Sequence, residues 1–173
     1  LTDPMAGAPP EIARQYLAVH GDDLGVNADA AQTAIVTDQY ADDLTGLTHV
    51  YFRQAYAGLE VVNANVNVNI TADGRVLSMG GAFAPADTAA GETIDSYLSV
   101  STADSAQQAI CQAAAQLAVS DQAAPVALVG PTTQADVGSI VFVDQAVSLD
   151  RIAAKLHYVA QADGLHLAWN MAL

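Results

Sequence analysis

The residues that could support acid–base or metal chemistry are few in this chain, and they are scattered. The four histidines are His20, His49, His157 and His166, and the single cysteine is Cys111. No histidine belongs to an H-E-x-x-H pattern, in which a spacing of four residues along a helix lets both rings bind one zinc ion. Phosphate-binding glycine loops and the G-x-S-x-G motif are absent as well. We therefore predict that the chain is not an enzyme and uses no metal or other cofactor.

Two aspartate pairs, Asp22-Asp23 and Asp42-Asp43, are the other groups that could bind a cation or transfer protons. A calcium loop needs oxygen ligands at ordered, alternating positions, and neither pair has that spacing. We interpret both pairs as solvated acids, and a hydrolase built on them is the weakest alternative. Cys111 stands in an alanine-rich segment without a neighbouring base, which is typical of a thiol that packs as a small apolar group.

The charge of the chain limits its partners. The 173 residues carry a formal net charge of −14. Because phosphate groups are bound by clustered Lys and Arg, we predict no binding to nucleic acid or to an anionic membrane. No apolar run approaches the roughly 20 residues that span a bilayer. The excess of acidic residues is explained by solubility, and electrostatic steering of a binding partner is the alternative explanation.

The N-terminal part contains one clear helix signal. Residues 1–10 lack the basic start and the apolar core of a secretion signal, so we expect any signal to have been removed and this stretch to be a disordered leader. Pro9-Pro10 suits the first turn of a helix that continues to His20. Residues 21–46 are acidic and polar, with a weakly helical middle.

The segment over residues 49–83 organises the rest of the chain. Its sequence is HVYFRQAYAGLEVVNANVNVNITADGRVLSMGGAF. Aromatic and β-branched residues, together with hairpin turns at Gly58 and Gly74, predict three consecutive antiparallel strands. The predicted strands are residues 49–56, 62–70 and 75–79. Such a meander needs a covering helix or sheet on its apolar face.

The middle strand of this meander alternates strictly. Successive side chains of a strand point to opposite faces, which predicts one dry face and one amide-lined face. The dry face comprises Val62, Ala64, Val66, Val68 and Ile70, and the other carries Asn63, Asn65, Asn67 and Asn69. We interpret the asparagine row as the solvated face of the sheet. A polar contact surface is the alternative.

The second half of the chain repeats the order of a helix followed by strands. Ser101 is a helix cap candidate, and the helix continues to about Val119. Short apolar runs predict further strands. These runs cover residues 126–129, 137–143 and 155–160, and a last strand covers residues 165–173.

Two stretches carry a resemblance to a known family. The run HVYFRQAYAGLEVVNANVNVNI followed by DGRVLSMGGAF resembles the N-terminal propeptide domain shared by fungalysin and thermolysin zymogens, and is closest to the fungalysin side. The ending AKLHYVAQADGLHLAWNMAL resembles the PepSY-type segment that follows it in fungalysin zymogens. The resemblance implies an α+β fold of two cystatin-like modules, each a helix packed on a curved antiparallel sheet. The modules would cover residues 9–85 and 100–173, with a linker over residues 86–99.

The resemblance also implies a function. The chain would be the propeptide of a secreted zinc metallopeptidase, and it would act as an intramolecular chaperone and as an inhibitor that blocks the catalytic cleft until it is removed. Its partner would be the cognate catalytic domain, and its location extracellular. A free-standing PepSY-type protease inhibitor or peptide-binding module is the alternative.

The C-terminal portion, residues 151–173, is the predicted inhibitory contact. In a zymogen the part nearest the junction has the highest effective concentration at the cleft. This portion also has the only net positive charge, from Arg151 and Lys155 against Asp163. The expected contact residues are Arg151, Lys155, Trp169, Asn170, Met171 and Leu173. Taken by itself, Trp169, the only tryptophan, is interpreted first as a core residue, with the contact role as the alternative.

Overall fold

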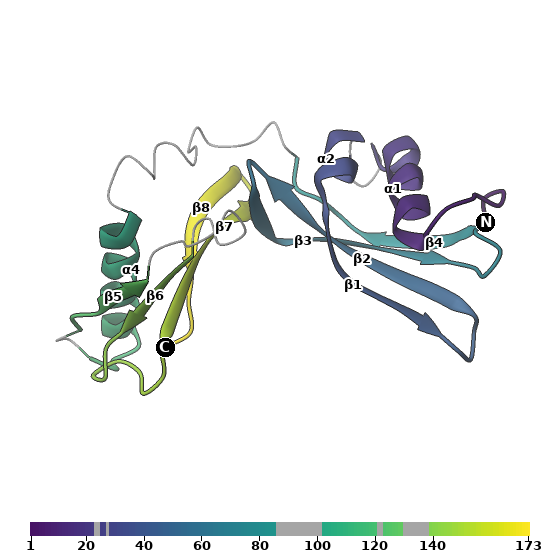
Figure 1. The fold of residues 1–173 in the computed structure, drawn as a ribbon. Coiled ribbons are helices and arrows are strands. Elements are labelled where there is room, and N and C mark those ends of the chain that lie inside the picture. The colour runs from purple at the N-terminus through teal and green to yellow at the C-terminus, as the bar shows by residue number, and fades with distance from the viewer. Residues whose placement is uncertain (23–24, 27, 86–101, 121–122, 130–138) are drawn as a thin grey trace. The chain divides into compact units, whose positions relative to one another are not determined.

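A computed structural model describes residues 1–22, 25–26, 28–85, 102–120, 123–129 and 139–173, and Figure 1 draws its fold. The contacts divide the chain into two compact units, and the division falls at residues 90 and 91 and again around a hairpin. Unit 1 comprises residues 1–90 and 158–166, and unit 2 comprises residues 91–157 and 167–173. The predicted linker, residues 86–99, and the predicted cap Ser101 lie outside the described residues.

Unit 1 contains a four-stranded antiparallel meander. Its strands are β1 (Ile35–Asp42), β2 (Leu47–Tyr56), β3 (Leu59–Ile70) and β4 (Val76–Gly81). Each strand pairs with the next along the chain. The three predicted strands are therefore confirmed as β2, β3 and β4, and β1 is an addition that the sequence did not predict.

Strand β1 was not predicted because it lacks the alternation of a half-buried strand. Residues 21–46 were expected to be a polar region with a weakly helical middle. The helix there is α2 (Ala28–Thr33), and β1 follows directly. None of the eight residues of β1 is buried, and six of them are exposed. A strand that is exposed to solvent on both faces does not need alternating apolar and polar residues, so hydrophobic periodicity does not reveal it.

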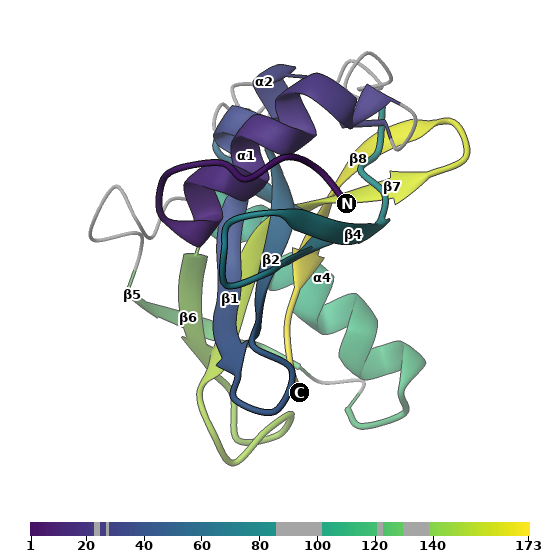
Figure 2. The same cartoon turned by 90° about the vertical axis from the view of Figure 1, so that its right-hand side faces the viewer.

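Two helices cover one face of this sheet (Figure 2). Helix α1 (Pro9–His20) begins with a proline at its first position, and the Glu11 carboxylate accepts a hydrogen bond from the Ala8 N–H at 3.1 Å. It packs on β2, β3 and β4, while α2 packs on α1 and β2. The core between the helices and the sheet includes Leu17, Phe52 and Val68, which are fully buried.

The dry face of β3 follows the prediction over most of its length. Ala64, Val66, Val68 and Ile70 are buried, as expected. Val62 is not; Val61 is buried in its place. The reason is an irregularity at Asn63, which has a φ of 66°, where the register with β2 shifts. An extra residue in one strand reverses the faces on either side of it.

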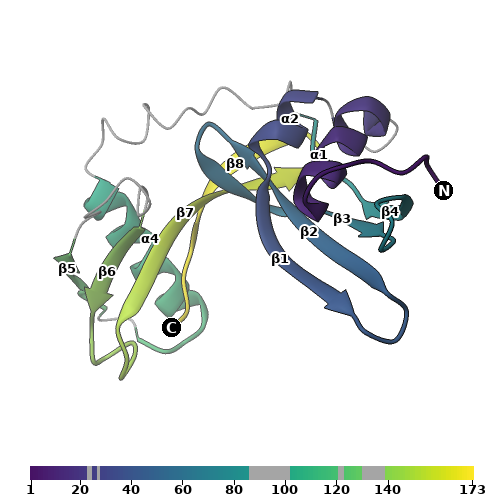
Figure 3. The same cartoon turned by 45° about the vertical axis from the view of Figure 1, so that its right-hand side comes forward.

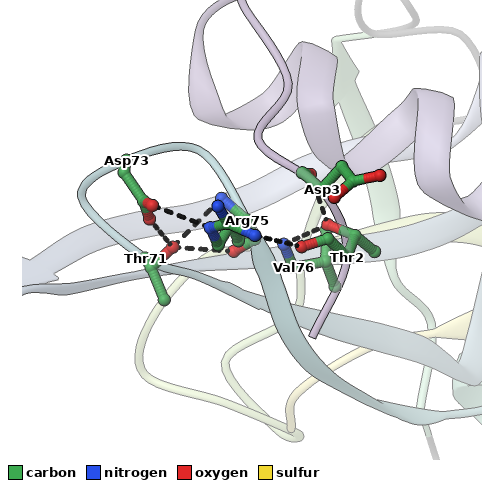
Figure 4. Close-up of polar contacts among 6 residues, drawn as sticks. All are labelled: Thr2, Asp3, Thr71, Asp73, Arg75 and Val76. Atoms are coloured by element: carbon green, nitrogen blue, oxygen red, sulfur yellow. Dashed lines mark hydrogen bonds and ion pairs between the residues drawn. The ribbon is translucent and has the colours of Figure 1, made fainter.

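The N-terminal residues are ordered, so the prediction of a disordered leader is wrong (Figure 4). Two hydrogen bonds join Thr2 to Val76. The Thr2 N–H donates to the Val76 carbonyl at 3.2 Å, and the Val76 N–H donates to the Thr2 hydroxyl at 3.0 Å. The Arg75 guanidinium donates to the Thr2 carbonyl at 3.0 Å and pairs with Asp73 at 2.8 Å. The Met5 N–H bonds the carbonyl of Gly74 at 3.0 Å. These bonds tie residues 1–5, which we call the N-terminal arm, to the start of β4 and to the turn before it.

Unit 2 joins one helix to strands. The helix α4 (Thr102–Gln116) packs on β5 (Val126–Val129) and β6 (Ser139–Val143). β6 also pairs antiparallel with the first part of β7 (Ile152–Gln161), and β8 (Gly164–Asn170) pairs with β7. The core of this unit is formed by Ala106, Ile110, Ala114, Ile140, Phe142, Val147, Ile152 and Ala154.

The tip of the β7–β8 hairpin belongs to unit 1, although the predicted second module contained all of residues 100–173. Tyr158 lies opposite Val61 in a short parallel pairing with β3. Its ring also meets the ring of Tyr56 edge to face, with 5.2 Å between centroids. The fold class is α+β, as predicted, but the sheet is mixed and not purely antiparallel, because β3 and β7 pair in parallel. The cystatin-like description of the two modules and their limits stay predictions. Among the described residues, no helix has both the length and the apolar character needed to cross a membrane.

Candidate functional site

The apolar members of the predicted inhibitory contact pack inside unit 2. Trp169, Met171 and Leu173 are half-buried against the core of that unit. The indole N–H of Trp169 donates to the Ser105 hydroxyl at 3.0 Å, which ties β8 to α4. These three side chains thus have a packing role in the chain itself, and their role as inhibitory contacts stays a prediction.

Two of the three polar members, Arg151 and Asn170, lie at the open end of the β7–β8 hairpin. Arg151 is exposed and directly precedes β7, and the exposed Asn170 ends β8. Since a short turn at Asp163 joins the two strands, the start of β7 and the end of β8 meet at the same end of the hairpin. Lys155 is half-buried within β7. The topology thus brings Arg151 and Asn170 to the same end of the hairpin, which the sequence alone did not establish, while Lys155 lies further along β7.

A second candidate surface is the face of the unit 1 sheet opposite the helices. Three aromatic rings stack across β1 and β2 there. The ring of Tyr40 lies 4.8 Å from that of His49 and 6.0 Å from that of Tyr51, measured between centroids. The hydroxyl groups of Tyr40 and Tyr51 are hydrogen-bonded at 3.2 Å. We call this face, from β1 to β4, the polar face.

Hydrogen bonds continue across the polar face toward β4. The side-chain oxygen Oδ1 of Asn69 accepts a hydrogen bond from Nδ1 of His49 at 2.7 Å. The side-chain nitrogen Nδ2 of Asn69 donates to the Ser78 hydroxyl at 2.9 Å. His49 therefore carries its hydrogen on Nδ1 in this arrangement. The predicted asparagine row is partly engaged in cross-strand contacts, beyond simple solvation. These bonds hold the side chains in fixed positions on a partly exposed surface.

A shallow hollow lies at the β1 side of the polar face. Its volume is about 490 Å³, and it is lined by Thr37, Asp38, Tyr40, Tyr51, Arg53 and Asn65. Arg53 donates from Nε to the side-chain oxygen of Asn65 at 3.2 Å and from Nη1 to the Glu60 carboxylate at 2.7 Å. The guanidinium is thus already oriented by two partners within the unit. This hollow offers an acid, a cation and aromatic surface side by side.

Hydrogen bonding also sets the protonation of this face. The bond with Tyr51, followed by burial, raises the pKa of the Tyr40 hydroxyl above its ordinary value. Bonds from the Thr45 hydroxyl and the Leu44 N–H hold the pKa of Asp42 below its ordinary value. At neutral pH the tyrosine is therefore neutral and the aspartate is charged. The β1 side of the polar face is acidic.

Sequence reasoning missed the members of this hollow. Tyr40 and Asp38 fell in a region expected to be without strands, so their positions beside Tyr51 and Arg53 had no signal. Only the asparagine row pointed to this face, as the alternative to a solvated surface. Within the part of the chain that the structure describes, no group of three or more His, Cys, Asp or Glu residues is placed to hold a metal ion.

Comparison with known proteins defines the class of this region. Residues 32–83 match the family described as Fungalysin/Thermolysin Propeptide Motif. The match runs from the end of α2 through β4, so it contains the whole meander and every residue that lines the hollow.

Individual relatives extend the similarity. Extracellular metalloproteinase 10 of Coccidioides posadasii is 33% identical over 145 residues, which cover 82% of this chain and 21% of that protein. Extracellular metalloproteinase mep of Aspergillus fumigatus is 36% identical over 86 residues, covering 47% of this chain and 13% of that protein. Probable extracellular metalloproteinase 5 of Arthroderma benhamiae is 49% identical over 49 residues, or 28% of this chain and 8% of that protein.

These findings confirm the resemblance to a fungalysin-type propeptide. The chain spans between 8% and 21% of the length of these relatives. The PepSY-like assignment of the C-terminal part is not tested by them and stays a prediction.

Proposed function

We propose that this chain is the propeptide of a secreted zinc metallopeptidase, and that it assists the folding of the catalytic domain and blocks its cleft until it is removed. The observation that carries the proposal is the match of residues 32–83 to the propeptide motif. The alignment of 82% of the chain with an extracellular metalloproteinase supports the same role for both units.

The chaperone part of the proposal rests on mass action. A domain that binds the native enzyme but not the unfolded one stabilises the native state, and covalent attachment makes the effective concentration high. The polar face suits such binding, because its side chains are already ordered by the contacts of Tyr40, His49 and Asn69. Less side-chain entropy is lost when an ordered surface binds.

The inhibitory part rests on the C-terminal portion. The open end of the β7–β8 hairpin presents Arg151 and Asn170 to solvent. The C-terminal portion also carries a net positive charge, from Arg151 and Lys155 against Asp163. Unit 2 supports this end through the packing of Trp169.

The experiment that tests the folding role is a refolding assay. The catalytic domain of the same precursor is denatured and diluted with the 173-residue chain in trans, without it, or with serum albumin as a control for crowding. We expect a high yield of active peptidase, after removal of the chain, only when the chain was present. Equal yields with the chain and with albumin would contradict the chaperone role.

A further inference from the structure

The outer edge of β1 is open in the part of the chain that the structure describes. There β2 is the only strand that pairs with β1, and Figure 3 shows β1 at the margin of the meander. Alternate residues of an antiparallel edge strand direct their N–H and C=O groups away from the neighbouring strand. The outward-facing residues of β1 therefore offer backbone donors and acceptors to an incoming strand, apart from the Gln39 N–H, which donates to the Asp38 carboxylate at 2.8 Å.

The core of unit 1 does not account for the presence of β1. No side chain of β1 is buried, and its large side chains Ile35 and Tyr40 are 40% and 47% exposed. At the other margin of the same meander, the N-terminal arm bonds Val76, the first residue of β4, and Gly74 in the turn before it. The start of that margin is thus held by the chain itself, while the long strand β1 has no buried side chain on either face.

Charge argues for the kind of strand that pairs there. Residues 15–52 contain six aspartates and neither Lys nor Arg. The one cation that lines the hollow, Arg53, is already paired with Glu60 at 2.7 Å. Asp38 and Asp42 lie opposite Tyr51 and Leu47 of β2, and Tyr40 between them lies opposite His49. Cross-strand partners share a face, so Asp38, Tyr40 and Asp42 all line the polar face.

A second copy of this chain does not fit the edge. Two β1 strands paired with each other would bring their aspartates close together, and like charges on neighbouring strands are destabilising. A basic strand fits better. Its alternate side chains would lie next to Asp38 and Asp42, and a Lys or Arg there could rest on the exposed ring of Tyr40.

We propose that the outer edge of β1 pairs with an extended, basic segment of the mature peptidase domain, adding a strand to the unit 1 sheet. The inference rests on the proposed function and specifies the partner of the polar face. Main-chain bonds along β1 supply affinity, and the acids beside the hollow select for Lys or Arg at alternate positions.

Hydrogen exchange tests the backbone pairing. The probe is the mature peptidase domain of the same precursor, inactivated at its active site and mixed with the 173-residue chain. In the free chain, the outward amides of residues 35–42 should exchange rapidly, while those bonded to β2 are protected. In the complex, the outward amides should slow by about tenfold or more, so that the alternation disappears.

Charge reversal tests the selection for a basic segment. Asp38→Lys should weaken binding of the inactivated domain by about tenfold, an effect that added salt reduces. The matched control is Asp3→Lys, which makes the same change on the exposed N-terminal arm and should leave the affinity unchanged. Circular dichroism of both variants checks that the fold is kept.

Each outcome has a distinct meaning. Binding without added protection in β1, or equal affinities for Asp38→Lys and the unmodified chain, would overturn the edge pairing and leave the propeptide role standing. No binding of the mature domain at all would overturn the propeptide role itself. Concentration-dependent self-association that protects β1 would make a second copy the occupant and would overturn the inference.

Discussion

Strands β3 and β1 belong to the same meander but are stabilised in different ways. β3 buries Val66, Val68 and Ile70 beneath the helices, whereas β1 buries none of its side chains. β3 is therefore specified by the hydrophobic effect, and β1 by backbone bonds to β2 and by the stacking of Tyr40. A strand that contributes no buried side chain can change its surface without disturbing the core, and such a strand suits recognition.

The largest expected effect lies on β3. Val68→Asp places a carboxylate in a fully buried position and should lower the free energy of unfolding by about 4 kcal/mol. Asn67→Asp, one residue away on the polar face, should change it by less than about 0.5 kcal/mol. Denaturant midpoints of the two variants measure the difference. Equal losses would show that the two faces of β3 are not distinguished by burial.

A buried amide that holds the chain after β4 has the next effect. Gln54 is 1% exposed, and its side chain exchanges two bonds of 2.8 Å with the backbone of Ala84. Gln54→Leu leaves the backbone N–H and carbonyl of Ala84 without their side-chain hydrogen-bond partner. It should reduce the free energy of unfolding by about 2 kcal/mol. Gln39→Leu, at an exposed position of β1, is the control in the same urea titration and should be nearly neutral. A neutral Gln54→Leu would mean that water replaces both bonds.

The N-terminal arm should contribute less. Arg75→Met removes the contacts with the Thr2 carbonyl and with Asp73, both at the surface, and should cost about 1 kcal/mol. The arm should then be cleaved faster than in the unmodified chain by a protease that cuts near residue 5, as followed by mass spectrometry. Unchanged cleavage would indicate that the backbone bonds of Thr2 and Met5 hold the arm without Arg75.

The smallest effect is the pH dependence from the β1–β2 turn. Because the pKa of Asp42 is lower in the folded chain than in the unfolded one, its contribution is complete above the unfolded pKa. It is lost as the pH falls through the folded pKa, which lies below the ordinary value of about 4. Asp42→Asn should therefore lose less stability on acidification than the unmodified chain. Acid titrations of both proteins are followed by circular dichroism. An equal loss of stability in Asp42→Asn and in the unmodified chain would contradict this prediction.

Burial explains how much of the fold could be predicted. The alternation in β3 and the turns at Gly58 and Gly74 predicted the meander, because buried strands and tight turns restrict residue types. Gly74 combines a φ of +81° with close contact to the Met5 carbonyl, so a side chain there would clash. The sequence did not reveal that Val61 is buried in place of Val62, since no local pattern marks the irregularity at Asn63, where the register with β2 shifts.

The candidate sites were predicted only in part. The C-terminal contact residues came from a resemblance and from net charge, and the structure adds that Trp169 packs on its own unit. The hollow on the polar face was missed because Asp38 and Tyr40 meet Arg53 through cross-strand pairing that no local pattern records. Long-range contacts of exposed strands are the least visible feature of a single sequence.

Inhibition of the mature peptidase by this chain is the most direct test of the propeptide role. Truncation after Asp150 is unsuitable, because it removes β7 and β8, which contribute residues 158–166 to unit 1. The double substitution Arg151→Ala with Lys155→Ala removes both positive charges of the C-terminal portion and keeps β7 and β8 in the chain. We predict that the unmodified chain inhibits the mature domain of its own precursor at a one-to-one ratio, and that the double variant does so about tenfold more weakly. Full peptidase activity at saturating concentrations of the unmodified chain would contradict the account.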